Sequence, residues 1–190
     1  TGQFPGSFGR GELYNADPAS GDARQCGTTA SLCGIEKAAY EKDEEALKKA
    51  IRFDLTLHTY MMTQAGIPVI YSGDEIGQEN DYGYHMDPKK CEDSRYIHRG
   101  KFQWDKAELR NHVGTLQYEI FQGLKKIETI RKSHKAFDAD ATVWTIDTWD
   151  DAILGLIKAK GEEKLVALFN FSAYDKVAWI NEDDGMYVDL

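Results

Sequence analysis

The sequence predicts an α/β segment followed by an all-β module. Residues 35–64 carry apolar side chains near helical spacing, and Gly66 follows them where a helix-terminating glycine is expected. Residues 67–71 then form a short apolar run bounded by glycines, which is typical of a strand buried on both faces of a parallel sheet. Beyond Ser133 the pattern changes to short strand-type runs, which indicates an antiparallel module.

Residues 1–33 are rich in Gly, Ser, Thr, Asp and Asn and show no sustained period, so they are predicted to be loop. The helix predicted over 35–64 contains an acidic cluster at residues 43–45, and Lys48 and Lys49 follow its two glutamates by four residues. His58 lies within this helix and is expected to be a packed or capping histidine.

Residues 72–112 are dense in acidic, basic and aromatic side chains and have no clear periodicity. A buried parallel strand that leads into such a segment is how α/β enzymes place chemistry at the carboxyl ends of strands. The functional residues are therefore expected in this segment.

A second helix is predicted over residues 113–134 from its apolar stripe and basic C-terminal end. Four candidate strands follow at residues 142–146, 152–158, 164–170 and 176–180, with turns at residues 150–151 and 160–163. Residues 185–190 also resemble a strand, which suggests that the β module continues.

A single parallel strand needs neighbouring strands and covering helices. We therefore expect residues 1–135 to be the tail end of a larger barrel, comprising a helix, a barrel strand, the loop after it and a further helix. Residues 136–190 would be a C-terminal antiparallel β-domain. The remaining barrel strands are expected to precede this chain.

Composition excludes several partners. A net charge of −9 argues against nucleic-acid binding, which requires clustered basic residues. No apolar run approaches the ~20 residues that cross a membrane. No signal peptide is visible at residue 1, so a cytoplasmic location is expected. Cys26, Cys33 and Cys91 lack metal-site spacing and are expected to be reduced thiols.

Several motifs resemble one enzyme family. Residues 66–77, GIPVIYSGDEIG, are similar to the eighth barrel strand of the α-amylase superfamily (glycoside hydrolase family 13), with the pattern G-x-P-x-I-Y-x-G-D-E-x-G. Residues 166–172, VALFNFS, resemble a strand of its C-terminal domain. Two further segments, 4–27 and 80–104, resemble the amylosucrase-like branch through GSFGRG, GDARQCG, ND, DSR and HR. Gly9, Cys26 and Gly100 depart from it, since Ala, Ser and Pro are usual there.

This resemblance implies that residues 1–135 are the C-terminal portion of a (β/α)8 TIM barrel, with the eighth strand, its rim loop and the final helix. It also implies a glucosyltransferase that converts sucrose into α-glucan and fructose by a retaining double displacement. No cofactor or metal is expected. The three catalytic carboxylates of the family lie on strands four, five and seven, so none is expected within this chain, which would be inactive alone. A sucrose hydrolase or an α-amylase of the same family is an alternative. A non-catalytic carbohydrate-binding or structural module is another.

The resemblance also implies four substrate-binding residues. Arg24 would contact sugar through its planar guanidinium, although an exposed loop arginine is the simpler alternative. Arg95 would pair with an aspartate that precedes this chain and so close a pocket for one glucosyl unit. Its alternative is local pairing with Glu92 or Asp93. Asn80 and Asp81 would reach sugar hydroxyls.

Other polar and aromatic residues favour structural roles. Asp74 and Glu75 are adjacent on leaving a strand and point in opposite directions, so they are expected to fix the barrel rim. Four loop aromatics could stack on sugar or pack the loop, namely Tyr82, Tyr84, Phe102 and Trp104. The sequon Asn170-Phe171-Ser172 falls on a predicted strand, and the acidic turn 181–185 is not expected to bind metal.

Overall fold

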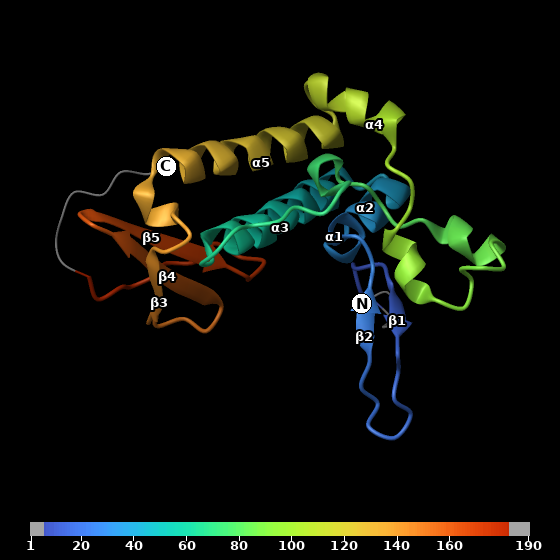
Figure 1. The fold of residues 1–190 in the computed structure, drawn as a ribbon, viewed down its shortest axis with the longest axis horizontal. Coiled ribbons are helices and arrows are strands. Elements are labelled where there is room, and N and C mark those ends of the chain that lie inside the picture. Colours follow the sequence, from blue (N-terminus) through green and yellow to red (C-terminus); the bar gives the residue numbers. More distant parts are fainter. Residues whose placement is uncertain (1–5, 183–190) are drawn as a thin grey trace. The chain divides into compact units, whose positions relative to one another are not determined.

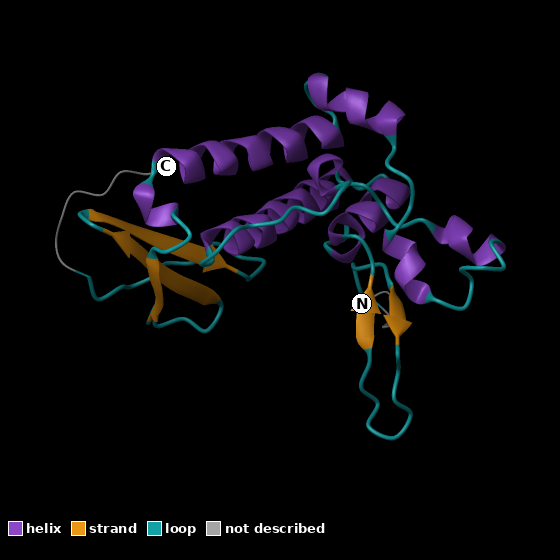
Figure 2. Cartoon of the chain, in the orientation of Figure 1, coloured by secondary structure: helices purple, strands orange, loops and turns teal. Residues whose placement is uncertain are grey.

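The computed structural model describes residues 6–182, which form two compact units (Figures 1 and 2). Of these described residues, 6–55 and 70–123 belong to the first unit, and 56–69 and 124–182 belong to the second. The division passes through the two long helices, whereas the sequence suggested a boundary at residue 135. The strand-like residues 185–190 and most of the acidic turn lie outside the described residues.

The first unit begins with a small hairpin. Strands β1 (Glu12–Tyr14) and β2 (Arg24–Cys26) pair antiparallel, with Glu12 opposite Cys26. Helix α1 (Thr29–Leu32) follows, and the Thr28 hydroxyl accepts a hydrogen bond from the Ser31 amide as its N-cap. The prediction of loop throughout residues 1–33 is therefore wrong for these elements. Strands of three residues are too short for a period of two to show in the sequence.

Helices α2 (Ile35–Glu41) and α3 (Glu44–Thr63) occupy the region predicted as one helix. The break lies at Lys42, whose φ is +57°, and at Asp43, whose carboxylate accepts a hydrogen bond from the Ala46 amide. An aspartate that caps the following helix restarts the hydrogen-bonding pattern, so helicity was predicted correctly and continuity was not. His58 is buried within α3, as expected.

The polar segment after residue 72 is built from short helical turns. Three 3₁₀ turns span Asp74–Ile76, Tyr82–Met86 and Ser94–His98. Helix α4 (Trp104–Glu108) and the 3₁₀ turn Leu109–Asn111 follow. Helix α5 (Leu116–Ser133) then confirms the second predicted long helix, and a last 3₁₀ turn spans Lys135–Phe137.

Residues 67–71 do not form the predicted buried strand. They pair with no strand of the described chain, and Ile67 and Val69 are 85% and 79% exposed. Both sheets of the described residues are antiparallel and lie elsewhere in the sequence. A parallel strand has no hydrogen-bonding partners without neighbouring strands, so the apolar pattern of this segment cannot be satisfied within residues 6–182.

The second unit contains a three-stranded antiparallel sheet in the order β3-β4-β5 (Figure 2). Strands β3 (Thr142–Ile146), β4 (Ile153–Lys160) and β5 (Glu163–Asn170) confirm three of the predicted strands. Gly161, at φ +61°, supports the tight turn between β4 and β5. The fourth predicted strand, 176–180, is wrong: it is not paired in the sheet, and Trp179 is 71% exposed.

Lys158 on β4 is a buried cation in this unit. Its side chain is fully buried, and its Nζ donates a long hydrogen bond of 3.4 Å to the Gln64 carbonyl. Burial lowers the pKa of Lys158, and the charge of Arg131 lowers it further. Arg131 itself donates to the carbonyls of Met62 and Gly66, which fastens α5 to the end of α3.

We expect Lys158→Met to raise the free energy of unfolding by about 1 kcal/mol at pH 7, because a long apolar side chain replaces a poorly paired buried charge. The lowered pKa means that the charge destabilises the fold most at low pH. That penalty disappears as pH rises past the usual lysine value of ~10.4. Urea denaturation of both proteins at pH 7 and pH 10 would check this. A gain that did not shrink at pH 10 would contradict it.

Candidate functional site

In the first unit, hydrogen bonds connect the polar loop, residues 78–103, to the N-terminal segment, residues 10–31. Asn80 makes the central connection. Its Oδ1 accepts from the Thr28 amide at 2.8 Å, and its Nδ2 donates to the Arg10 carbonyl at 3.1 Å. Its own amide donates to the Ser31 hydroxyl at 2.9 Å. Three polar groups of one residue therefore hold two segments that lie far apart in sequence.

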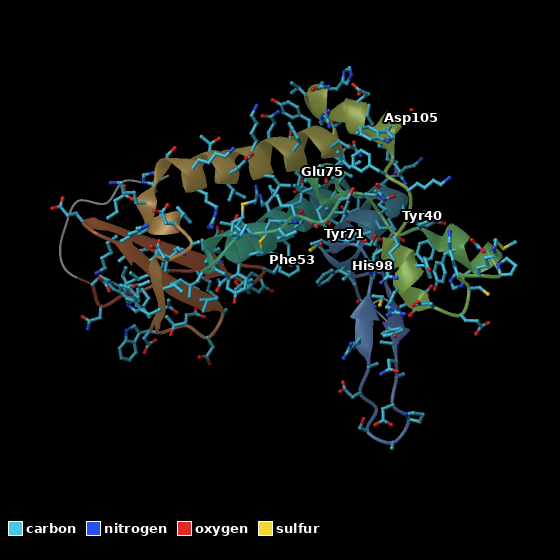
Figure 3. The ribbon with its side chains drawn as sticks, in the orientation of Figure 1. Tyr40, Phe53, Tyr71, Glu75, His98 and Asp105 are labelled. Carbon is cyan, nitrogen blue, oxygen red and sulfur yellow. The ribbon has the colours of Figure 1, made fainter. Side chains whose placement is uncertain are left out.

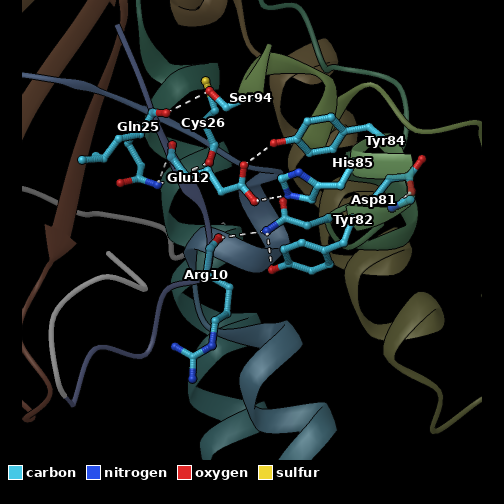
Figure 4. Close-up of polar contacts among 12 residues, drawn as sticks. Arg10, Glu12, Gln25, Cys26, Asp81, Tyr82, Tyr84, His85 and Ser94 are labelled. Carbon is cyan, nitrogen blue, oxygen red and sulfur yellow. Dashed lines mark hydrogen bonds and ion pairs between the residues drawn. The ribbon is translucent and has the colours of Figure 1, made fainter. Parts of the chain in front are cut away.

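Glu12 on β1 makes a second connection (Figure 4). The Tyr84 hydroxyl donates to its Oε2, and His85 Nε2 lies 2.9 Å from its Oε1. Tyr84 is buried, and its ring stacks on that of His85 with centroids 4.1 Å apart. Burial, reinforced by the hydrogen bond to Glu12, raises the pKa of Tyr84, so the hydroxyl keeps its proton and remains a donor.

Arg95 and Asp93 form a bidentate ion pair. Arg95 Nη2 lies 2.7 Å from Asp93 Oδ2, and Nε donates to Oδ1 at 2.8 Å. The guanidinium stacks over the Tyr14 ring at 4.5 Å, while the neighbouring Ser94 hydroxyl donates to the Leu13 carbonyl at 2.9 Å. Hydrogen bonding from Arg95 lowers the pKa of Asp93 to about 2. Arg95 thus has the local partner that the sequence offered as an alternative, and its pocket-closing role stays a prediction.

A cavity of about 180 Å³ opens beside these contacts, at the end of residues 67–71 where chemistry was expected. Its lining includes Gln25, Cys26, Thr28, Tyr71, Asp74 and His98. The rings of Tyr71 and His98 meet edge to face, with centroids 6.1 Å apart (Figure 3). The cavity therefore joins the β2 segment, the apolar run and the polar loop.

His98 lines this cavity and has a ring nitrogen without a hydrogen-bond partner among the described residues. Its Nδ1 is buried and has no hydrogen-bond partner in the described part of the chain, and the same holds for Gln25 Oε1. Burial lowers the pKa of His98, and the charge of Arg99 lowers it further, so the imidazole is neutral at pH 7. A nitrogen of a neutral imidazole can donate a hydrogen bond to a ligand hydroxyl or accept one from it, depending on the tautomer. An amide oxygen can accept one.

The predicted substrate-binding residues are not among those that line this cavity. Arg24 is exposed on β2, directly before the cavity-lining Gln25. Asp81 accepts a hydrogen bond from the Gly83 amide at 2.8 Å as the N-cap of the turn Tyr82–Met86. Asn80 and Asp81 thus position the loop, and sugar contact by Arg24, Asn80 and Asp81 stays a prediction.

Two departures from the family patterns have steric explanations. A Cβ on Gly9 would lie 2.8 Å from the Leu32 carbonyl oxygen, and one on Gly100 would lie 2.7 Å from the Asp81 Cβ. Neither distance is tolerated by a side chain. The third, Cys26, is buried, and burial raises the pKa of its thiol. All three cysteines are free thiols.

The loop aromatics divide between packing and exposure. Tyr84 is buried, while Tyr82 donates its hydroxyl to Glu36 Oε1 at 2.7 Å. Phe102 and Trp104 meet edge to face at 4.7 Å, and Trp104 is 71% exposed. Glu75 accepts from the Gly73 amide at 2.7 Å, in keeping with a structural role.

Sequence reasoning missed Glu12 and did not single out the roles of His98 and Tyr71. Glu12 lies in a segment read as loop, and nothing local marks it as the partner of Tyr84, 72 residues away. His98 belongs to the HR motif of the loop pattern, so that motif was the available signal. The asparagine of the sequon ends β5 as expected, and its Oδ1 accepts from the Ser172 amide at 2.9 Å.

We expect Arg95→Gln to raise the pKa of Asp93 from about 2 toward its usual value of ~3.9, because the bidentate donor is lost. A carboxyl whose pKa is lower in the folded than in the unfolded state stabilises the fold at pH values above its unfolded pKa. This stabilisation is lost as pH falls toward 2. The free energy of unfolding of the variant should therefore change less with pH between the folded and unfolded pKa values of Asp93. An NMR titration of the Asp93 carboxyl measures the shift, and Arg110→Gln is a matched control. An unchanged Asp93 titration would contradict the pairing.

These features define the first unit as a scaffold that fixes a polar, aromatic-rich loop beside a small polar cavity. Within residues 6–182, no group of three His, Cys, Asp or Glu side chains is arranged to hold a metal ion. No described helix has the length and apolar character needed to cross a membrane.

No family model matches the chain. It is similar to glucosylglycerate phosphorylase from Escherichia coli strain K12, with 30% identity over 132 residues. The match covers 68% of this chain and 22% of that protein, so the matched region spans less than a quarter of the relative's length. This similarity supports a relation to glycoside-active enzymes and does not extend to the amylosucrase-like branch.

Proposed function

We propose that this chain is part of an enzyme that transfers a glucosyl unit from sucrose to an α-glucan, with retention of configuration. One observation carries the proposal. The two segments that resemble the amylosucrase-like branch are hydrogen-bonded to each other, through Asn80 to Arg10 and through Ser94 to Leu13. These contacts join residues 70 and 81 positions apart, so the two patterns act as one structural module.

The fold proposed for the whole enzyme is a (β/α)8 barrel with a C-terminal β-domain. Residues 1–135 would contribute the end of the barrel, and residues 136–190 the β-domain. The exposed side chains of Ile67 and Val69 support this arrangement, because adjacent barrel strands and helices would cover them. The antiparallel sheet β3-β4-β5 is compatible with the proposed β-domain.

The chemistry would be divided between this chain and the rest of the enzyme. In a retaining mechanism one carboxylate attacks the anomeric carbon while a carboxylic acid ~5 Å away protonates the leaving oxygen. A hydroxyl of the acceptor then displaces the carboxylate from the glucosyl-enzyme and yields its proton to the same acid–base group. Those carboxyls belong to strands outside this chain in our proposal.

This chain would bind and orient the donor. Arg24, Asn80, Asp81 and Arg95 are the proposed substrate-binding residues, with neutral His98 at the cavity to exchange hydrogen bonds with sugar hydroxyls. Asp93 occupies Nε and Nη2 of Arg95. A guanidinium carries five N–H donors, so a second carboxylate from another strand can share Arg95 without breaking the local pair.

Phosphorolysis is the second candidate, and the similarity to glucosylglycerate phosphorylase supports it. In this reaction inorganic phosphate would replace the glucan hydroxyl as the acceptor of the glucosyl group. The glucosyl-enzyme would form in the same way. The two candidates therefore differ in the acceptor and in the donor's leaving group.

The test uses the full reading frame that contains this sequence. The purified enzyme is incubated with sucrose, with sucrose plus inorganic phosphate, and with glucosylglycerate plus phosphate. Fructose and α-glucan from sucrose alone would support the first candidate. Phosphate-dependent glucose 1-phosphate would support the second. Absence of turnover in all three incubations would refute glucosyl transfer. Turnover by the 190-residue chain alone would refute the proposal that the catalytic carboxyls lie outside this chain.

A further inference from the structure

Strand β1 contacts the polar loop through each of its three residues. Glu12 accepts hydrogen bonds from the loop, and the Leu13 carbonyl accepts one from the Ser94 hydroxyl at 2.9 Å. Tyr14, the last residue of the strand, places its ring against the guanidinium of Arg95. Among these three contacts, that of Tyr14 is made to a residue proposed to bind substrate.

Two neighbours restrict the guanidinium of Arg95. Asp93 occupies one edge, accepting from Nε at 2.8 Å and from Nη2 at 2.7 Å. The Tyr14 ring covers one face, with its centroid 4.5 Å from Cζ. An ion pair along one edge leaves the plane of the guanidinium free to tilt about that edge, whereas a stacked aromatic ring fixes the plane. The direction of the remaining donors therefore depends on Tyr14.

The far edge of Arg95 remains open to a ligand. Nη1 makes no hydrogen bond within residues 6–182, and 42% of the Arg95 side chain is exposed. Nη1 and the second N–H of Nη2 form a pair of parallel donors, which suits a carboxylate or two vicinal hydroxyls. Both donors reach such an acceptor together only when the guanidinium lies in the plane of that acceptor.

Arg24 lies beside Tyr14 on the hairpin. The two residues are directly opposite each other in the β1–β2 register. Directly opposite residues of antiparallel strands project from the same face. Tyr14 meets Arg95 on that face. Tyr14 is therefore a neighbour of both arginines that are proposed to bind substrate.

We propose that Tyr14 is a positioning residue for the glucosyl donor and that it acts through Arg95. Its ring holds the guanidinium in the plane in which the open edge meets the donor, and Tyr14 itself does not contact the reacting atoms. The inference rests on the substrate-binding role of Arg95 in the proposed function. Tyr14 lies outside the GSFGRG and GDARQCG patterns, so the folded contact and not a motif identifies it.

The experiment uses the full-length enzyme and the glucosyl donor that it turns over. Tyr14→Leu and Tyr14→Val remove the ring, whereas Tyr14→Phe keeps it. Tyr96→Leu is the matched control, because Tyr96 packs against the same buried cluster as Tyr14 and carries Arg99 at 5.4 Å. We expect kcat/KM to fall about fivefold in both ring-removing variants and to stay within about twofold in Tyr14→Phe and Tyr96→Leu.

A double-mutant cycle separates positioning from a general loss of stability. In an Arg95→Gln background, Tyr14→Leu should change kcat/KM by less than about twofold, because the group that Tyr14 positions is no longer present. A fivefold loss that persisted in this background would show that Tyr14 acts through the fold and not through Arg95. That result would overturn the inference.

Exchange of the Arg95 Nε proton tests the inference without turnover. In enzyme labelled with nitrogen-15 arginine, Tyr14→Leu should accelerate this exchange at least about fivefold, and Tyr96→Leu should leave it unchanged. Unchanged exchange in Tyr14→Leu overturns the inference even in an active enzyme. Accelerated exchange in an enzyme that turns over no glucoside supports the positioning of Arg95 by Tyr14 and refutes the proposed function.

Discussion

Replacing Gly11 with alanine is expected to lower the free energy of unfolding by about 2–3 kcal/mol. A Cβ at this position would overlap the Cys26 carbonyl oxygen and would lie 2.5 Å from Gln25 Nε2 and 2.9 Å from Leu32 Cδ2. The carbonyl belongs to the β2 backbone, so relief requires the hairpin to shift rather than a side chain to rotate. Thermal and urea unfolding of the two proteins would measure the loss.

Gly21→Ala provides the comparison for this substitution. A Cβ on Gly21 meets nothing within 4 Å, although its φ of +71° makes alanine unfavourable by about 1 kcal/mol. Gly11→Ala should therefore be the more damaging of the two. Equal losses would show that the close approach of Gly11 to β2 is no more destabilising than the unfavourable backbone conformation at Gly21.

Replacing Asn80 with alanine is expected to lower the free energy of unfolding by about 2–3 kcal/mol, since both side-chain connections to the N-terminal segment disappear. The Thr28 amide and the Arg10 carbonyl would lose their partners. Hydrogen exchange at the Thr28 amide should accelerate together with exchange in the Ser94–His98 turn, because both depend on the docked loop. Denaturation combined with exchange mass spectrometry would measure both effects.

Two variants make the Asn80 result specific. Asn80→Asp keeps the acceptor for Thr28 and loses the donor to Arg10, so its stability should fall between wild type and alanine. Asn111→Ala changes an exposed asparagine in the same unit and should stay within ~0.5 kcal/mol of wild type. If Asn80→Ala behaved like Asn111→Ala, the connection would not hold the loop in solution.

Elements with long, strong periodicity could be predicted from the sequence. Helix α5 and the three strands from Thr142 to Asn170 repeat their pattern often enough to be recognised, and structure follows sequence closely there. The break between α2 and α3 was harder, since it depends on one capping aspartate and one residue at positive φ. The hairpin β1–β2 was missed because each strand has only three residues.

The prediction of a buried strand at residues 67–71 was wrong for a different reason. An apolar run of this kind indicates a strand that is buried between adjacent strands and helices, and these are absent from the described residues. The candidate site shows the same limit: the local pair of Arg95 with Asp93 was among the alternatives, because the two are close in sequence. The meeting of Glu12 with Tyr84 was not, since it depends on the folded path of 72 residues.

The length of chain between hydrogen-bonded partners also sets an order of assembly. The β4–β5 hairpin closes through the tight turn at Gly161, whereas the Ser94–Leu13 bond must close a loop of 81 residues. Loop closure becomes entropically more expensive with length, and distant contacts form late. During synthesis the hydrogen bond between Ser94 and Leu13 can therefore form only after Ser94 has been added to the chain. Until then the N-terminal hairpin lacks the hydrogen bonds that the polar loop makes with it.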